Sequence, residues 1–287
     1  MVGRFAWVLN LDADLELARG PAYAPSASVA RATSAYAEQL RRSLVGEDDV
    51  VIDASTREGS ARGLVGRAFC PTPRAIAMLR RAGAEPEPHP PAVVFRRVAS
   101  RAFSASLGHT MPKAAFVTRM GEAREILRGD PSPGTGWRVK RAFGMAGRGH
   151  RVVDRDPRDQ DVAFLARFIE EGGAQIEPDV RVVREYALHG VVSRDGSHRV
   201  GELTAQRTDA AGAWLATELA PEAPTEVVEA IAAEATRAAR ALASVGYFGP
   251  FGVDAFTYRS GDRVAFRARS EINARYSMGF AVGFGRP

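Results

Sequence analysis

Three polar residues near the C-terminus, with one aspartate ahead of them, have the types and the spacing of a magnesium site. Glu271, Asn273 and Arg275 alternate along the chain, so an extended segment points their side chains toward one face. Asp254 lies in the preceding apolar segment, and a Ser-Gly turn between the segments brings it within reach of that row. Carboxylate and amide oxygens suit Mg²⁺ shared with substrate phosphates. Because the hairpin is apolar, we favour a metal site over the alternative, a solvated polar face.

A second candidate site is the glycine-rich segment that follows Lys140. The chain has 39 Lys and Arg residues, and only Lys113 and Lys140 are lysines. Gly144, Gly147 and Gly149 let backbone N–H groups turn toward an anion, and Lys140 adds a compact positive charge that suits a phosphate. The segment is neither a Walker A motif nor a dinucleotide fingerprint, because a predicted strand follows it instead of a helix. Taken alone, it fits a phosphate-binding loop and a flexible hairpin equally well.

The first hundred residues alternate between short apolar runs and helical patterns. The predicted strands are 5–9, 50–52 and 92–95, and the predicted helices are 28–44 and 75–81. Strands that alternate with helices indicate a small parallel α/β domain over residues 1–100.

Antiparallel strands dominate the rest of the chain. The predicted strands are 137–140, 150–153, 184–192, 199–205, 214–218, 251–258 and 263–269. The predicted helices are 122–127, 159–169 and 226–244, the last capped by Thr225, and we expect 141–149 to be a loop. An α/β half therefore precedes an α+β half.

Composition and charge narrow the class of protein. The 287 residues are 45% hydrophobic and 25% charged, which is ordinary for a globular chain with a sizeable core. The net charge is +5, but acids are interleaved with the arginines, so we predict no nucleic-acid partner. No apolar run is long enough to span a membrane, and Asp12, Asp14 and Glu16 stand where a signal peptide would be cleaved. We predict a cytoplasmic protein with no membrane partner.

Two side chains with reactive chemistry are interpreted as structural. Cys70 is the one cysteine, which excludes a disulfide framework and a multi-cysteine metal site, and its apolar neighbours favour a core position. His189 shares a strand face with Glu185, yet a hydrogen-bonded structural histidine is the more common outcome than one that faces a cleft.

The order of these features resembles the ATP-grasp superfamily, in particular its carboxylate–amine and carboxylate–thiol ligases, over nearly the whole chain. The most specific part is the stretch 246–254 followed by the Glu-x-Asn-x-Arg row. The resemblance implies an ATP-grasp fold, in which a Rossmann-like pre-ATP-grasp domain precedes two α+β subdomains that clamp ATP. The implied domains are 1–100 for the first and 101–287 for the ATP-grasp domain, with a small lid subdomain at 101–176 and a C-terminal subdomain at 177–287.

The resemblance also assigns residues to the nucleotide. It implies that Lys140 contacts the α- and β-phosphates of ATP, and that the backbone near Glu177 and Val180 bonds the adenine edge as a hinge. Glu185 matches the acid that binds the ribose hydroxyls. The residues assigned to the mobile loop that covers the triphosphate are Gly144, Gly147, Arg148 and Gly149.

The same resemblance implies one or two Mg²⁺ ions, with Mn²⁺ as an alternative. The implied ligands are Asp254, Glu271 and Asn273. Arg275 would steady the transferred phosphoryl group, and Arg101 stands near the place of a lysine that family members usually carry, as a further phosphate contact. Gln206 or Arg207 falls where members often place another polar phosphate ligand.

The implied reaction joins a carboxylate to an amine or thiol through an acyl-phosphate and releases ADP and phosphate. Two alternatives stay open: a phosphotransferase built on the same ATP site, and a silent ATP-binding or regulatory protein. The partners implied are ATP, a small-molecule carboxylate and an amine, and a homodimer is an option because members are often dimers. The chain ends 14 residues after Asn273, so we expect the C-terminal helix of many members to be short or absent, which leaves the closing of the acceptor pocket open.

Overall fold

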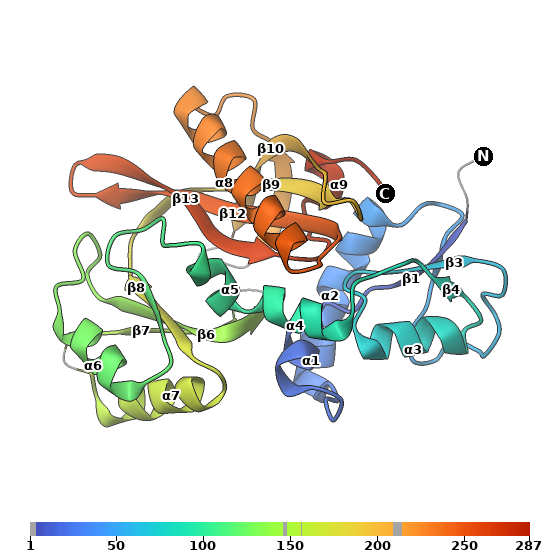
Figure 1. The fold of residues 1–287 in the computed structure, drawn as a ribbon, viewed down its shortest axis with the longest axis horizontal. Coiled ribbons are helices and arrows are strands. Elements are labelled where there is room, and N and C mark those ends of the chain that lie inside the picture. Colours follow the sequence, from blue (N-terminus) through green and yellow to red (C-terminus); the bar gives the residue numbers. More distant parts are fainter. Residues whose placement is uncertain (1–3, 146–147, 156, 209–213) are drawn as a thin grey trace.

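The computed structural model describes residues 4–145, 148–155, 157–208 and 214–287. Its strands form three sheets, which we call the N-terminal, middle and C-terminal sheets. In Figure 1 the N-terminal sheet lies at one end of the molecule, the other two lie toward the opposite end, and two short helices run between them. No helix in the described part of the chain combines the length and the apolar character that crossing a membrane requires.

The N-terminal sheet is parallel, with strand order β2-β1-β3-β4. Its elements are β1 (Phe5–Val8), α1 (Ala13–Arg19), α2 (Ala27–Leu44), β2 (Val50–Val51), β3 (Val65–Ala68), α3 (Pro73–Arg81) and β4 (Glu85–Pro86). Successive side chains of β1 point to opposite faces, so Ala6 and Val8 pack with α3 residues while Trp7 packs on the other side. Thr72 begins α3 by accepting a hydrogen bond from Ala75 N.

Two helices connect this sheet to the rest: α4 (Ala92–Ala99) and α5 (Arg101–Ser106). The strand predicted at 92–95 is therefore wrong. A short apolar run with paired valines fits a strand and a buried helix equally well from periodicity alone. Tertiary packing decides for the helix, because Phe95 and Val98, three residues apart, are both buried while Val93 is 72% exposed.

The middle sheet is antiparallel, with strand order β5-β8-β6-β7. Its elements are β5 (Ala115–Val117), α6 (Met120–Arg128), β6 (Trp137–Met145), β7 (Arg148–Val153), α7 (Asp159–Glu170) and β8 (Ala174–Pro178). Strand β6 continues past the predicted end at Lys140, and β7 begins before its predicted start, so 141–145 and 148–149 of the expected loop are strand, with an irregular pairing between Lys140 and Met145. The core under α6 and α7 contains Leu127, Trp137 and Phe168.

The C-terminal sheet is antiparallel, with strand order β11-β10-β9-β12-β13. Its elements are β9 (Val182–Val192), β10 (His198–Thr208), β11 (Trp214–Leu219), α8 (Thr225–Ser244), β12 (Gly249–Ser260), β13 (Arg263–Asn273) and α9 (Phe280–Gly283). Helix α8 packs its apolar stripe on this sheet through Ile231, Ala235 and Leu242. Pro224, and not the expected Thr225, stands at its N-cap.

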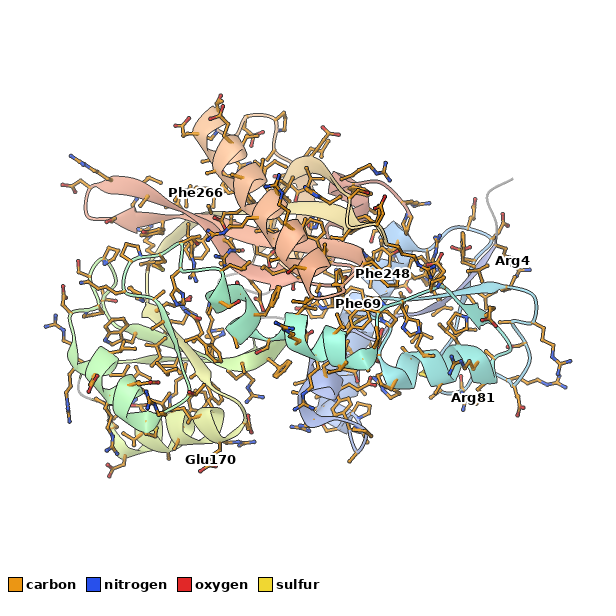
Figure 2. The ribbon with its side chains drawn as sticks, viewed as in Figure 1. Arg4, Phe69, Arg81, Glu170, Phe248 and Phe266 are labelled. Carbon is orange, nitrogen blue, oxygen red and sulfur yellow. The ribbon has the colours of Figure 1, made fainter. Side chains whose placement is uncertain are left out.

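One apolar core joins the N-terminal and C-terminal parts of the chain. Phe69 lies at this junction, where side chains fill the space between the two sheets (Figure 2). Phe69 N donates to Val8 O at 2.8 Å, and Tyr276 N donates to Phe69 O at 3.1 Å. The segment after β13 is thereby fixed directly to the N-terminal sheet.

Candidate active site

A cavity of about 950 Å³ lies where the three sheets meet, and all of the sequence-predicted site residues with described side chains line it. These residues are Arg101, Lys140, Gly144, Gly149, Glu177, Val180, Glu185, Arg207, Asp254, Glu271, Asn273 and Arg275. Gln206 lines it too. Gly147 lies outside the described residues, and Arg148 begins β7 with a side chain outside the described part.

Lys140 on β6 is paired with a buried acid on the adjacent strand β8. Lys140 Nζ lies 2.6 Å from Glu177 Oε1, and Arg267 Nη1 lies 2.9 Å from Glu177 Oε2. Burial would raise the pKa of Glu177, but the Arg267 and Lys140 charges outweigh it and lower that pKa to about 2. Burial lowers the pKa of Lys140, and Glu177 opposes that shift. Glu177 therefore holds the Lys140 ammonium at the cavity wall, a role that the sequence analysis did not assign to its side chain.

Arg101, at the start of α5, ties β6 to β13. Its Nη1 donates to Arg141 O at 2.8 Å, and its Nη2 donates to Glu271 Oε1 at 2.9 Å. A Cβ atom on Gly144 would lie 2.6 Å from both Arg101 Nη1 and Nη2. Gly144 thus makes the close approach of Arg101 possible, which is a packing reason for glycine at this position.

The predicted metal ligands lie together on the β12–β13 hairpin. Asp254 is directly opposite Glu271 in the antiparallel register, and Gly252 is opposite Asn273. Asn273 Nδ2 donates to Asp254 Oδ2 at 2.8 Å. Burial, reinforced by the Glu271 charge, raises the pKa of Asp254 to about 7, although the Asn273 hydrogen bond works against the shift. Like charges directly opposite across a strand pair are destabilising, so a divalent cation between them would relieve an unfavourable arrangement.

Neighbouring positive charges outweigh the effect of burial on the pKa of Glu271, whereas at Asp254 the opposing interactions are too weak to do so. Burial would raise the pKa of Glu271, but Arg101, Lys140 and Arg275 outweigh it and lower that pKa. Within the described ranges, no cluster of three or more His, Cys, Asp or Glu side chains is placed to hold a metal ion. The donor set here is two carboxylates and one amide, which suits a Mg²⁺ that keeps waters and takes its remaining ligands from phosphate oxygens.

Arg275 is held by an acid from the opposite end of the sequence. Arg275 Nη2 lies 2.8 Å from Asp14 Oδ2, and its Nη1 donates to Tyr276 O at 3.1 Å. The guanidinium carbon stands 5.1 Å from the centroid of the Phe69 ring. Burial would lower the pKa of Arg275, but Asp14 raises it. The sequence analysis missed Asp14, although its place just after the first strand of a parallel sheet is where α/β sites gather.

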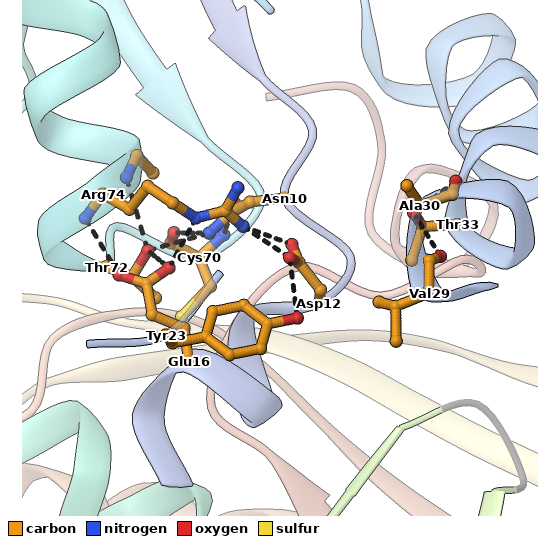
Figure 3. Close-up of polar contacts among 11 residues, drawn as sticks. Asn10, Asp12, Glu16, Tyr23, Val29, Ala30, Thr33, Cys70, Thr72 and Arg74 are labelled. Carbon is orange, nitrogen blue, oxygen red and sulfur yellow. Dashed lines mark hydrogen bonds and ion pairs between the residues drawn. The ribbon is translucent and has the colours of Figure 1, made fainter. Parts of the chain in front are cut away.

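A polar network joins Asp12 and Glu16, the acids on either side of Asp14 in the sequence, to Thr72 and Arg74, as Figure 3 shows. Arg74 Nη2 lies 2.6 Å from both carboxylate oxygens of Asp12, and its Nε lies 3.3 Å from Glu16 Oε2. Thr72 Oγ1 donates to Glu16 Oε2 at 2.7 Å. Asp12 and Glu16 flank Asp14 on either side of the start of α1, so this network sets the position of the acid that holds Arg275.

Parts of the cavity wall come from segments that the sequence analysis did not connect to the site. These parts include Leu11, Ala32, Thr33, Tyr36, Trp214, Leu215, Ser277, Met278 and Gly279. Helix α2 and strand β11 therefore face the same space as the acidic hairpin. Cys70 and His189 are buried, as expected of structural side chains.

Comparisons with known proteins were made by sequence and by structure. No family model matches the chain. No curated protein matches it either. Among solved structures, D-alanyl-alanine synthetase A from Vibrio cholerae is similar at a TM-score of 0.58 and 13% identity, covering 99% of this chain and 92% of that one.

Two further structures of similar fold were solved with nucleotides. D-alanine–D-alanine ligase from Bacillus anthracis, complexed with ATP, has a TM-score of 0.54 at 13% identity and covers 96% of this chain and 87% of that one. N5-carboxyaminoimidazole synthetase from Staphylococcus aureus, complexed with ADP, has a TM-score of 0.52 at 14% identity, covering 96% of this chain and 72% of that one. These likenesses establish the architecture and confirm the predicted fold class: the chain has the ATP-grasp fold.

Proposed function

We propose that this protein is an ATP-dependent ligase that joins a small-molecule carboxylate to an amine or thiol. The observation that carries the proposal is a single cavity bordered by Lys140, by the Asp254–Glu271 pair and by Arg275. A cationic wall facing a carboxylate pair suits a triphosphate with its divalent cation. Two neighbours of the same fold bind ADP or ATP.

The nucleotide site that we propose uses the residues assigned from the sequence. Lys140 contacts the phosphates, the backbone near Glu177 and Val180 bonds the adenine edge, and Glu185 takes the ribose. Asp254, Glu271 and Asn273 would hold Mg²⁺, which when bound neutralises charge on the β- and γ-phosphates. The carboxylates suit the ion because burial, and after it the Glu271 charge, raises the pKa of Asp254, and a bound cation would stabilise the charged carboxylate.

The proposed reaction has two steps and needs no covalent intermediate on the protein. A carboxylate oxygen bonds to the γ-phosphorus as the bond to the ADP oxygen breaks, which leaves an acyl-phosphate. The acceptor nitrogen or sulfur then bonds to the acyl carbon, phosphate leaves, and the acceptor loses a proton. Arg275, held by Asp14, and Lys140, held by Glu177, orient and neutralise the oxygens through both steps.

The test is an ADP-release assay with Mg²⁺ and ATP over panels of carboxylates, amines and thiols, given singly and in pairs. A ligase releases ADP fully only when a carboxylate and an acceptor are both present, and the joined product is then detected by mass spectrometry. ADP release with one substrate and a phosphorylated product would instead identify a phosphotransferase. ATP binding without turnover on any pair would identify a silent nucleotide-binding protein. Either of these results contradicts the proposal.

A further inference from the structure

A chain of polar side chains runs from the interior of the C-terminal sheet to the cavity wall. Thr204 Oγ1 donates to Ala187 O at 2.9 Å and stands 3.5 Å from His189 Nε2. His189 Nδ1 lies 3.0 Å from Ser277 Oγ. Thr204 and His189 are buried, whereas Ser277 lines the cavity. The chain therefore ends on an atom that a substrate can touch.

The direction of the hydrogen bonds along this chain follows from the number of protons available. A threonine hydroxyl has one proton, and Thr204 gives it to the carbonyl of Ala187, so toward His189 it can only accept. The imidazole proton is then on Nε2, which leaves Nδ1 as an acceptor for the Ser277 hydroxyl. With its proton committed to His189, Ser277 Oγ presents only lone pairs to the cavity.

The imidazole sits in a niche that three glycines leave open, Gly252 on β12 and Gly279 and Gly283 at the two ends of α9. A Cβ atom on Gly252 would lie 3.0 Å from His189 Nδ1, one on Gly279 would lie 2.9 Å from Nε2, and one on Gly283 would lie 3.0 Å from Cδ2. Side chains at these places would push the ring out of line. Burial lowers the pKa of His189 to about 4, so the ring is neutral at pH 7 and keeps Nδ1 as an acceptor.

Ser277 belongs to the wall that surrounds the reacting end of the proposed site. It follows Arg275 by two residues, and Met278 and Gly279 after it also line the cavity. Trp214 Nε1 donates to Thr217 Oγ1 at 2.8 Å, and that threonine packs against Gly279, which places β11 on the same side.

We propose that Ser277 Oγ accepts a hydrogen bond from an N–H of the acceptor substrate, with His189 and Thr204 as positioning residues. This rests on the proposed ligase function and narrows the acceptor to an amine. An oxygen that offers lone pairs alone attracts N–H donors and repels carboxylate, phosphate and thiolate groups. The acceptor amine is thereby aimed at the acyl-phosphate formed beside Arg275.

The main experiment compares the full-length wild type with Ser277→Ala in the ADP-release assay. We expect the KM for the amine to rise roughly tenfold, the size of one lost hydrogen bond, while the Kd for ATP measured by calorimetry stays unchanged. Ser277→Thr keeps the hydroxyl and is expected to restore the wild-type KM. Ser244→Ala, on an exposed turn of α8, is the matched control. An unchanged amine KM in Ser277→Ala overturns the proposal.

A second measurement tests the hydrogen-bonded series Thr204–His189–Ser277 without relying on turnover. ¹⁵N chemical shifts of His189 report its tautomer directly, and we expect a proton on Nε2 and none on Nδ1 from pH 5.5 to 8. A proton on Nδ1 overturns the assignment. If the wild type uses thiols or hydroxyls as acceptors and ignores amines, this inference fails while ATP-dependent activation stands. If no acceptor supports turnover and the tautomer is as expected, the proposed function fails instead.

Discussion

At the scale of single residues, the two lysines of the chain give a direct comparison. Lys140 lies at the cavity wall with Glu177, whereas Lys113 pairs with Asp130 on the surface. We expect Lys140→Ala to raise the Kd for ATP about tenfold to a hundredfold, because one charge contact to phosphate is lost. Glu177 keeps Arg267 as a partner, so the variant should fold.

Lys113→Ala is the matched control for this change, and we expect no effect on ATP affinity. Calorimetry with ATP and Mg²⁺ measures both variants. Equal affinities for the two variants and the wild type would remove Lys140 from the nucleotide site.

The raised pKa of Asp254 predicts that the free energy of unfolding depends on pH. Its pKa of about 7 in the folded state exceeds the ordinary value near 4, so the folded state holds a proton that the unfolded state has lost between these pH values. Stability therefore falls as pH rises through this window, by up to about 4 kcal/mol. Asp254→Asn removes this loss.

Without divalent cations, we expect Asp254→Asn to exceed the wild type in free energy of unfolding at pH 8 but not at pH 4. Urea unfolding at the two pH values measures the difference. The variant should also lose the additional stability that Mg²⁺ with ATP confers on the wild type. A difference between the two proteins that does not depend on pH would contradict the proposed cause.

At the scale of elements, Gly144 couples strand β6 to helix α5. Alanine there would place a Cβ atom 2.6 Å from the Arg101 guanidinium and displace it from Glu271. We expect Gly144→Ala to lower the free energy of unfolding by about 1–3 kcal/mol and to reduce ADP release. Denaturant unfolding and the ADP assay measure the two effects.

Gly121→Ala in α6 is the control, because a Cβ atom there meets no atom within 4 Å. A helix gains about 0.5–1 kcal/mol from this exchange, so the control should be as stable as the wild type or more stable. If both glycine variants behave alike, the Arg101 contact is not what requires glycine at 144.

The elements themselves were largely predictable from local patterns. The helix at 28–44 and the long helix at 226–244 have strong apolar periodicity, and both formed within a residue or two of the predicted bounds. The run at 92–95 became helix because burial of Phe95 and Val98 outweighs β-branching. The apolar pattern also predicted that strand β6 ends at Lys140. This end is too early, because β6 pairs with β7 as far as Met145.

At the scale of the whole molecule, Asp14 and Arg275 connect chain segments 261 residues apart. We expect Asp14→Asn to reduce the rate of ADP release about tenfold to a hundredfold while the Kd for ATP is kept, because Arg275 loses the charge that orients it. A double-variant cycle with Arg275→Lys should be non-additive. Additive effects would show that Asp14 acts elsewhere than through Arg275.

The contact between Asp14 and Arg275 is an example of what the sequence alone does not predict about the site. Glu271, Asn273 and Arg275 form a local alternating row, and Lys140 precedes a glycine-rich segment, so spacing makes each of them a candidate, although for Lys140 a flexible hairpin fits the spacing equally well. Asp14, the Glu177 side chain and the walls from α2 and β11 depend on how distant segments pack. No local spacing encodes that packing, which is why the sequence analysis did not assign them to the site.

The central claim is that the acidic hairpin and Lys140 bind a magnesium-bound nucleotide between them. Calorimetric titration of ATP into the wild type, with Mg²⁺ and with EDTA, and into Glu271→Gln with Mg²⁺ tests it most directly. We predict one site per chain in the wild type, with affinity at least tenfold weaker in EDTA and in the variant. Equal affinity under all three conditions, or no binding to the wild type, would contradict the account.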